Sequence, residues 1–347
     1  MINKLKKASL LLTLFSLSTV VTLNASNIEI TIPKTPDVLV KVPEAPKVIV
    51  IDGNDNAKYN KEPVKKKYNS IGGSKRVPPN FNKKENCTDS KQIKPGEVSN
   101  NRLSAYLQTQ IVPKKDILIN LEKAGFDILG EYKIDKKGKL VSIIFTNKEL
   151  TTSASKSSRG FASTLRLLID KKNKKISVTN PLYIMKAFMQ DEYNAKLAKK
   201  TLASLHKAFS CLENSKDVVK FSRLKRYQFM QNMPYYKDMI TVAKGDVKKL
   251  LKKAKKSKKI VFEQHLDNGS VLLGVKLKKR TNKFVKKIGY QNSELLPYPV
   301  LLEGGVAKIL DPKYYIAIMY PLLSMSEFMT IATIPGAIRK DCDKVFR

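Results

Sequence analysis

A stretch that occurs twice constrains this chain more than any other feature. KISVTNPLYIMKAF contains Asn180-Pro181 and precedes a helical run that ends at Cys211. VAKILDPKYYIAIM contains Asp311-Pro312 and precedes a run that ends at Cys342. The same separation of 131 residues joins several pairs of like residues, namely Pro181 and Pro312, Tyr183 and Tyr314, Cys211 and Cys342, Gly138 and Gly269, and Leu165 and Leu296. One constant offset over such a length predicts two copies of one folding unit.

The hydrophobic patterns follow the same order in both copies. In the first module, residues 101–212, LSAYLQTQIV reads as a strand and PKKDILINLEKAG as a helix. Strand pairs follow around the turns DKKGK and KKNKK, and DEYNAKLAKKTLASLHKAFSC closes the module as a helix. The second module, residues 235–347, repeats this order from YYKDMITV, with turns at LDNGS and Glu303-Gly304-Gly305. The predicted fold class is therefore α+β, with two tandem modules ordered strand, helix, four strands, helix, each built on an antiparallel sheet.

The first 25 residues have the pattern of an export signal. MINKLKK is basic, ASLLLTLFSLSTVVTL is apolar, and LNAS offers small residues for cleavage after Ala25. We therefore expect a signal peptide over residues 1–25 and a periplasmic or secreted protein. The alternative is an uncleaved membrane anchor, because the apolar run is nearly long enough to span a bilayer.

A second apolar segment, residues 314–338, carries only one charged residue, Glu327. Its length suits a transmembrane helix, but Pro321 and Pro335-Gly336 interrupt it, and Pro335-Gly336 should kink or break the helix. The matching segment of the first module is charged and amphipathic. We therefore predict that residues 314–338 are buried in the protein and pack on more than their own sheet.

Residues 26–100 are predicted to be an extended and disordered linker. ITIPKTPDVL and VKVPEAPKVI form a short repeat rich in proline and β-branched residues, which suits a stiff spacer or, as the less favoured alternative, a strand added to a sheet edge. Residues 51–100 are rich in Lys, Asn, Gly and Pro and have little to bury. Residues 213–234 connect the modules, and their basic and aromatic character is interpreted as a solvated face rather than an anion-binding patch.

The charge balance of the chain indicates the kind of partner. There are 66 Lys and Arg residues against 30 Asp and Glu residues, a formal net charge of +36. This excess favours an anionic envelope polymer, a lipid surface or a small anionic ligand as partner, although lysines spread over solvated faces are the favoured explanation of the excess itself. Nucleic acid is not expected, because the excess is mostly Lys without clustered Arg and because the chain is predicted to be exported. Assembly into a homo-oligomer stays open.

Motifs that carry known chemistry are absent from the sequence. We find no GxGxxG, GxxxxGK[ST], HExxH, GxSxG or CxxC, and the two His residues, His206 and His265, lie far apart. No cofactor and no metal site is therefore predicted. Strand alternation places Glu263 and His265 on one face, where they would form an acid/base pair, but an exposed strand face is the favoured interpretation.

The three cysteines suggest one disulfide and one free thiol in an oxidising compartment. Cys211 and Cys342 follow matching helices, so their bridge is the favoured pairing. The alternative is that Cys87, in the linker, bonds one of them.

The segment LPYPVLLEGGVAKILDP, residues 296–312, resembles domain-of-unknown-function family 302. In that family a Leu-Pro precedes an apolar strand, an acidic-Gly turn leads to a Val-rich strand, and an Asn-Pro or Asp-Pro starts a helix. The resemblance covers residues 235–345 and, more weakly, 103–211, where Leu165-Arg166 replaces the Leu-Pro and KKNKK replaces the acidic turn. It implies a compact α+β domain with an antiparallel sheet and brings no catalytic residues.

These observations lead to a functional hypothesis. The chain is expected to be an exported, non-enzymatic binding or scaffold protein of the periplasm or cell envelope, because two modules create a cleft and no catalytic constellation is visible. The alternative hypothesis is an enzyme whose active site lies in the cleft between the modules and uses Glu263 and His265.

Overall fold

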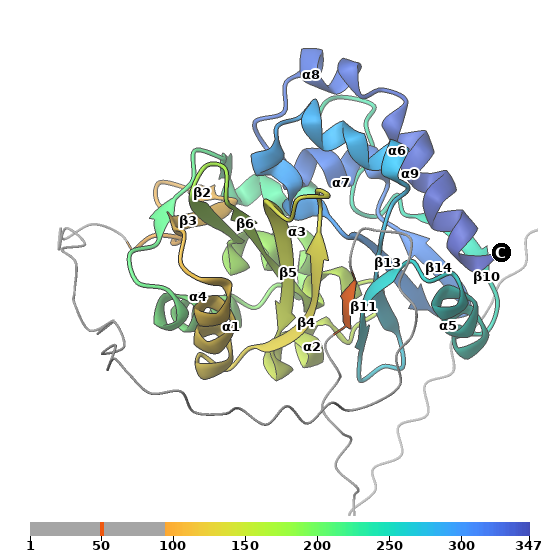
Figure 1. The fold of residues 1–347 in the computed structure, drawn as a ribbon, viewed down its shortest axis with the longest axis horizontal. Helices are drawn as coiled ribbons and strands as arrows, with labels where there is room; N and C mark the ends of the chain where they lie inside the picture. The colour runs from red at the N-terminus through yellow and green to blue at the C-terminus, as the bar shows by residue number, and fades with distance from the viewer. Residues whose placement is uncertain (1–48, 52–93) are drawn as a thin grey trace, which may run out of the picture. The chain divides into compact units, whose positions relative to one another are not determined.

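The computed structural model of this protein describes residues 49–51 and 94–347. Within these ranges the fold is α+β, with helices packed on mainly antiparallel sheets (Figure 1). The predicted α+β class is confirmed, and its division into two tandem modules stays a prediction. The predicted signal segment and most of the predicted linker, including Cys87, lie outside the described residues.

The first sheet has seven strands in the order β1-β4-β5-β6-β7-β3-β8. Its strands are β1 (Ile49–Ile51), β3 (Tyr106–Gln110), β4 (Asp127–Lys133), β5 (Leu140–Thr146), β6 (Leu165–Asp170), β7 (Lys175–Thr179) and β8 (Glu213–Asn214). All neighbours are antiparallel except β1, which runs parallel to β4. A separate pair joins β2 (Arg102–Ser104) to β9 (Val218–Lys220). The turn between β4 and β5 uses Gly138 at φ 59°, a conformation that glycine adopts without steric cost.

The second sheet has five antiparallel strands in the order β10-β14-β13-β12-β11. They are β10 (Ile240–Lys244), β11 (Ile260–His265), β12 (Val271–Val275), β13 (Tyr298–Glu303) and β14 (Val306–Ile309). Read in the same sense, the first sheet contains β3-β7-β6-β5-β4, so strands with matching places in the two modules occupy matching places in the two sheets. Descent of both sheets from one duplicated unit stays a prediction.

The repeated Asn-Pro and Asp-Pro pairs start helices in both modules. Asn180 accepts a hydrogen bond from the Leu182 amide at 3.0 Å, and Asp311 accepts one from the Lys313 amide at 2.8 Å. The prolines occupy the first turn, where no amide donor is needed. The helices of the described residues are α1 (Lys114–Lys123), α2 (Lys148–Ala154), α3 (Pro181–Met189), α4 (Ala195–Ala208), α5 (Val247–Lys256), α6 (Lys279–Asn282), α7 (Pro312–Met319), α8 (Met325–Thr330) and α9 (Ile334–Asp343).

The helical runs that end each module are interrupted, which corrects the sequence prediction. The first run breaks after Met189, where Gln190 has φ 54°, and resumes as α4. The second run is divided into α7, α8 and α9. The break predicted near Pro335-Gly336 is confirmed, because α8 ends at Thr330 and Pro335 lies in the first turn of the new helix α9. The short helices α2 and α6, between the two strand pairs of each module, were not predicted.

Two parts of the predicted linker are ordered. Residues Ile49–Ile51 add to the edge of the first sheet as β1, so the less favoured alternative, strand addition, describes these three residues. Near the start of the first module, the Gly96 amide donates to Asn214 Oδ1 at 2.8 Å. His206 Nε2 lies 2.8 Å from the Pro95 carbonyl oxygen. Residues 94–100, which the sequence placed in the linker, therefore belong to the described fold of the first module.

The apolar segment at 314–338 begins in the core. In α7, Tyr314 and Ile316 are buried, and the Tyr183 hydroxyl of α3 donates to the Ile318 carbonyl at 2.7 Å. This contact confirms the predicted packing of the segment on more than its own sheet, but the predicted burial of all of residues 314–338 is wrong, because Leu322 and Met329 are 52% and 62% exposed. A search of residues 49–51 and 94–347 for a helix long and apolar enough to cross a membrane finds none.

Positions related by the 131-residue offset contact each other where the modules meet. A Cβ at Gly130 in β4 would lie 3.0 Å from the Val261 carbonyl oxygen in β11. Arg166 Nη1 in β6 donates to the Pro297 carbonyl at 2.7 Å. Contacts between matching positions are the pattern that a two-fold axis produces. The strands β4 and β11 thus lie side by side with almost no space between their backbones.

This close approach predicts the effect of a single methyl group. Gly130→Ala should lower the free energy of unfolding by about 1–3 kcal/mol, because the new Cβ would meet a backbone oxygen that cannot rotate away. Gly336→Ala in α9 is the matched control: nothing lies within 4 Å, so helix propensity should stabilise it by up to about 1 kcal/mol. Urea denaturation measures both changes. Equal stability of the two variants would contradict the proposed tight contact.

Candidate anion-binding site

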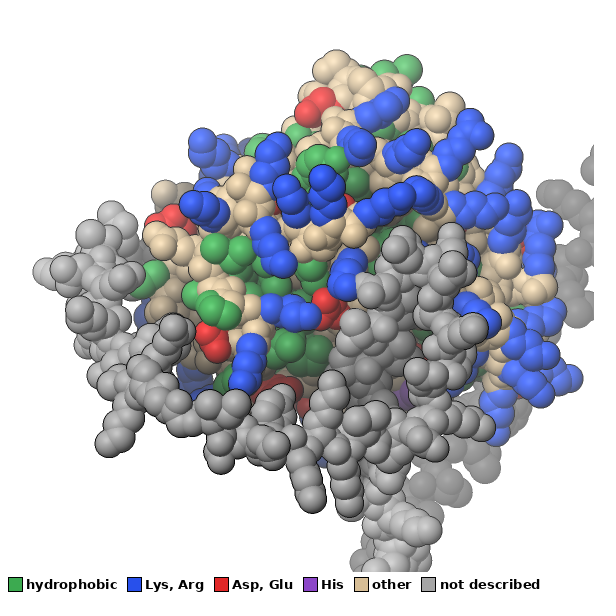
Figure 2. All heavy atoms as spheres, in the orientation of Figure 1, with side chains coloured by type: hydrophobic (Ala, Val, Ile, Leu, Met, Phe, Trp, Pro, Cys, Tyr) green, Lys and Arg blue, Asp and Glu red, His purple; other side chains and the backbone are tan. Residues whose placement is uncertain are grey.

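A pocket of about 270 Å³ lies between α5, the segment after β12 and the end of α9. Cationic side chains dominate its wall, which we call the lysine pocket: Lys253, Lys256, Lys259, Lys276, Lys278, Lys344 and Arg347, with Ser257, Val345 and one acid, Asp341. Figure 2 shows Lys and Arg side chains gathered densely over this region, at the right of the view around α5.

Local periodicity explains why each lysine points outward. In α5, Leu250 and Ala254 are buried at helical spacing, which leaves Lys253 and Lys256 on the solvent side. Asp246 starts this helix by accepting from the Lys249 amide at 3.1 Å. After β12, Leu277 is buried, so the flanking residues Lys276 and Lys278 point to the other side. The end of α9 supplies the third segment of the wall.

The pocket keeps a net positive charge because its cationic side chains outnumber its one acid, Asp341, even though Arg347 pairs with Asp343 beside the wall. Asp341 Oδ2 accepts a hydrogen bond from the Lys278 amide at 2.9 Å and fixes the backbone. Among the described residues, none of the six pocket lysines forms an ion pair with Asp or Glu. Hydrogen bonding with the Lys278 amine, and then charge repulsion, lower the pKa of Lys344. The pocket therefore has the positive electrostatics that suit an anion-binding site.

The predicted Glu263 and His265 pair is in contact but lies outside this pocket. Glu263 Oε1 is 2.5 Å from His265 Nε2, as strand alternation predicted, and Glu263 Oε2 is 2.9 Å from Lys255 Nζ. The His265 side chain is 64% exposed. The carboxylate is thus shared between the Lys255 ammonium group and the His265 ring on an exposed strand face, and an acid/base role stays a prediction.

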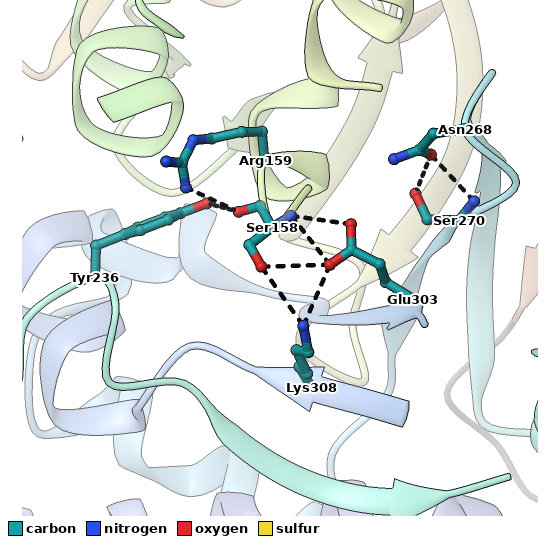
Figure 3. Close-up of polar contacts among 7 residues, drawn as sticks. All are labelled: Ser158, Arg159, Tyr236, Asn268, Ser270, Glu303 and Lys308. Carbon is teal, nitrogen blue, oxygen red and sulfur yellow. Dashed lines mark hydrogen bonds and ion pairs between the residues drawn. The ribbon is translucent and has the colours of Figure 1, made fainter. Parts of the chain in front are cut away.

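A second polar cluster joins the two modules and was not found from the sequence (Figure 3). The Ser158 amide donates to both Glu303 oxygens at 2.9 and 3.0 Å. Lys308 Nζ lies 3.2 Å from Glu303 Oε2 and 3.5 Å from Ser158 Oγ. Tyr236 donates to the Ser158 carbonyl at 2.5 Å. No pattern marks this cluster, because its members lie in separate segments and only Glu303 belonged to a predicted turn.

The serine and lysine of this cluster superficially match a nucleophile and its base. A general base must be free to take a proton, and the Lys308 ammonium is instead paired with the Glu303 carboxylate. The Glu303 side chain is 12% exposed, so the pair is largely shielded from solvent. We therefore interpret the cluster as a structural contact that holds the loop before residue 160 against the β13–β14 hairpin.

The favoured bridge between Cys211 and Cys342 is wrong. Cys342 is a free thiol on the inner face of α9, and burial raises the pKa of this thiol. Cys211 is disulfide-bonded and exposed. Although the two cysteines hold matching sequence positions, one faces the core and the other faces solvent. Pairing of Cys211 with Cys87, which lies outside the described residues, stays a prediction.

Metal ligands do not gather in the described part of the chain. No group of three or more His, Cys, Asp or Glu side chains in residues 94–347 could hold a metal ion.

A buried carboxyl group, Glu294, lies against the first sheet. It is fully buried, and neither carboxyl oxygen has a partner with hydrogen-bond geometry among the described residues, although Ser177 is close. Burial raises the pKa of Glu294 to about 8, with smaller contributions from Asp217 and Asp170. The group is therefore expected to be protonated and uncharged at neutral pH.

Comparisons with known proteins do not identify the chain. No family model matches it, and searches of curated proteins and of solved structures return no significant match. The resemblance to domain-of-unknown-function family 302 therefore stays a prediction.

Glu294 predicts a fall in stability as the pH rises. Between its unfolded pKa of 4.5 and its folded pKa of about 8, the folded chain holds a proton that the unfolded chain has lost. The free energy of unfolding should fall across this window, by on the order of 4 kcal/mol, and level off above it. Glu294→Gln should remove this loss, whereas Glu122→Gln, at an exposed position, should keep it. Urea denaturation at about pH 5 and about pH 9 measures the difference. A parallel pH dependence in wild type and Glu294→Gln would overturn the assignment.

Proposed function

We propose that this chain is a non-enzymatic binding protein of the periplasm or cell envelope, and that the lysine pocket holds an anionic group of its ligand. One observation carries the proposal: seven cationic side chains from three segments surround one hollow, and the only acid in its wall is engaged by a backbone amide. Ammonium groups that converge on one volume bind an anion more strongly than the same charges on a convex surface.

The pocket wall supports binding better than catalysis. The Ser257 hydroxyl donates to the Ala254 carbonyl at 2.6 Å and accepts from the Lys259 amide at 3.2 Å. Both bonds are made to the backbone at the end of α5. Asp341 is engaged by Lys278. The lining therefore offers several donors for an anion and no nucleophile paired with a base.

The envelope part of the proposal rests on the predicted signal segment, which lies outside the described residues. If export removes this segment after Ala25, the mature chain begins at Ser26. N-terminal sequencing of the protein purified from the periplasm or medium measures this directly. A chain that retains Met1 and sediments with membranes would instead support the anchored alternative.

The binding part of the proposal predicts a loss of phosphate affinity. Inorganic phosphate is the probe, and isothermal titration calorimetry at low ionic strength measures its dissociation constant. Lys278→Gln combined with Lys344→Gln should weaken binding by about tenfold or more, because each charge-assisted hydrogen bond contributes roughly 1.5–3 kcal/mol. The structure should tolerate both changes, since both side chains are exposed.

The matched control changes the same net charge elsewhere. Lys196→Gln combined with Lys199→Gln alters two exposed lysines of α4, on the first module, and should leave phosphate binding unchanged. Equal losses in the two double variants would reduce the effect to net charge and remove the pocket from the proposal. Absence of any phosphate or sulfate binding to the wild-type chain would do the same.

A further inference from the structure

The helix α6 connects the lysine pocket to the first module. Lys278 lines the pocket, and Lys279 is the first residue of α6. Asn282, the last residue of α6, donates from Nδ2 to the Ile134 carbonyl at 3.3 Å, next to the β4–β5 turn. The short helix therefore lies between the wall of the lysine pocket and the β4–β5 turn of the first sheet.

A second pair of lysines meets at this connection. Hydrogen bonding with the Lys279 amine, and then repulsion, lower the pKa of Lys136 in the β4–β5 turn. The first pair, Lys278 and Lys344, belongs to the pocket. Because Lys278 and Lys279 are consecutive, their Cα atoms are only about 3.8 Å apart. Four exposed lysines thus form one connected row in the order Lys344, Lys278, Lys279, Lys136.

The surroundings extend this lysine row rather than neutralise it. Lys137, Lys139, Arg280 and Lys283 are exposed beside it. The nearest acid of the turn, Asp135, accepts from the Leu140 amide at 2.9 Å and shapes the turn. Figure 2 shows a continuous band of Lys and Arg side chains from the β4–β5 turn, past α6, to the region of α5.

We propose that the lysine row is a binding track for a linear polyanion with repeated phosphate groups, and that the lysine pocket is one end of this track. The inference rests on the proposed function and adds the ligand's class, since a single anion in the pocket cannot also reach Lys136. Lysines act as point charges without the planar geometry that reads bases, and the row contains no aromatic side chain on which a base could stack. These features favour a polymer recognised through its charge alone.

The test compares a short and a long probe on the same variants. The probes are inorganic phosphate and a soluble polyphosphate chain long enough to cover the row. Wild-type protein should bind the polyphosphate much more tightly than phosphate. Lys136→Gln combined with Lys279→Gln should weaken polyphosphate binding by about tenfold and reduce the slope of log affinity against log salt by about one to two. Phosphate binding should not change, because neither residue lines the pocket.

The control and the contrary outcomes separate this inference from the proposed function. Lys171→Gln combined with Lys172→Gln, in the exposed β6–β7 turn, should affect neither probe. Phosphate binding in the pocket with no additional affinity for polyphosphate, or no effect of the Lys136 and Lys279 changes, would overturn the track and leave the pocket standing. Failure of both probes would overturn both. Tighter binding of single-stranded DNA or of anionic vesicles than of polyphosphate, at equal charge, would overturn the assignment of the polymer.

Discussion

The contact between β4 and β11 fixes how the two sheets meet, and the rest of the arrangement depends on it. Gly130 lets the backbone of β4 approach the Val261 carbonyl with no side chain between them. Beside this contact, the buried guanidinium of Arg166 donates to the carbonyls of Glu294 and Pro297 at 3.1 and 2.7 Å. A buried charge is costly unless its donors are satisfied, so these bonds hold the segment before β13 firmly on the first sheet. Earlier in the same connection, the Asn282 side chain holds α6 beside the β4–β5 turn by donating to the Ile134 carbonyl.

The two modules share strand order but differ in surface charge. At the 131-residue offset, Lys253 matches Glu122, Lys344 matches Glu213 and Lys278 matches Asn147. The core-facing residues of α1 and α5 are apolar in both modules, so the difference lies on the solvent side. A buried face must keep its shape to pack, whereas an exposed face can change without loss of the fold. If the modules arose by duplication, the lysine pocket is a specialisation of the second module, and the first contributes its β4–β5 turn.

Sequence periodicity predicts which face of a helix or strand is buried better than it predicts which elements pack against each other. The stripe Ala198, Leu202 and Leu205 is buried as its spacing predicts, and the turns at Gly138 and Gly269 adopt positive φ. The break at Gln190 was not predicted because no Pro or Gly marks it: a glutamine takes the positive φ that ends the helix. The free, buried state of Cys342 was not predicted because residues at matching sequence positions need not be equally buried. The lysine pocket could not be predicted for a related reason. The pattern of α5 shows which face of the helix is exposed to solvent. It does not show that the end of α9 lines the same pocket.

The distribution of ion pairs distinguishes an anion site from an ordinary solvated surface. Elsewhere in the described chain, carboxylates sit next to lysines, as Glu131 does with Lys114 at 2.6 Å and Glu149 with Lys200 at 2.6 Å. A surface that merely needs solubility gains nothing from placing two ammonium groups in contact, because like charges repel and lower the stability of the folded chain. At the lysine row this repulsion occurs twice, at the lysine pocket and at α6, which follows it in the chain. A ligand that supplies several negative charges removes the repulsion and stabilises the folded state through its own binding. The crowding of lysines is therefore the feature on which the proposed binding of a polyanion rests.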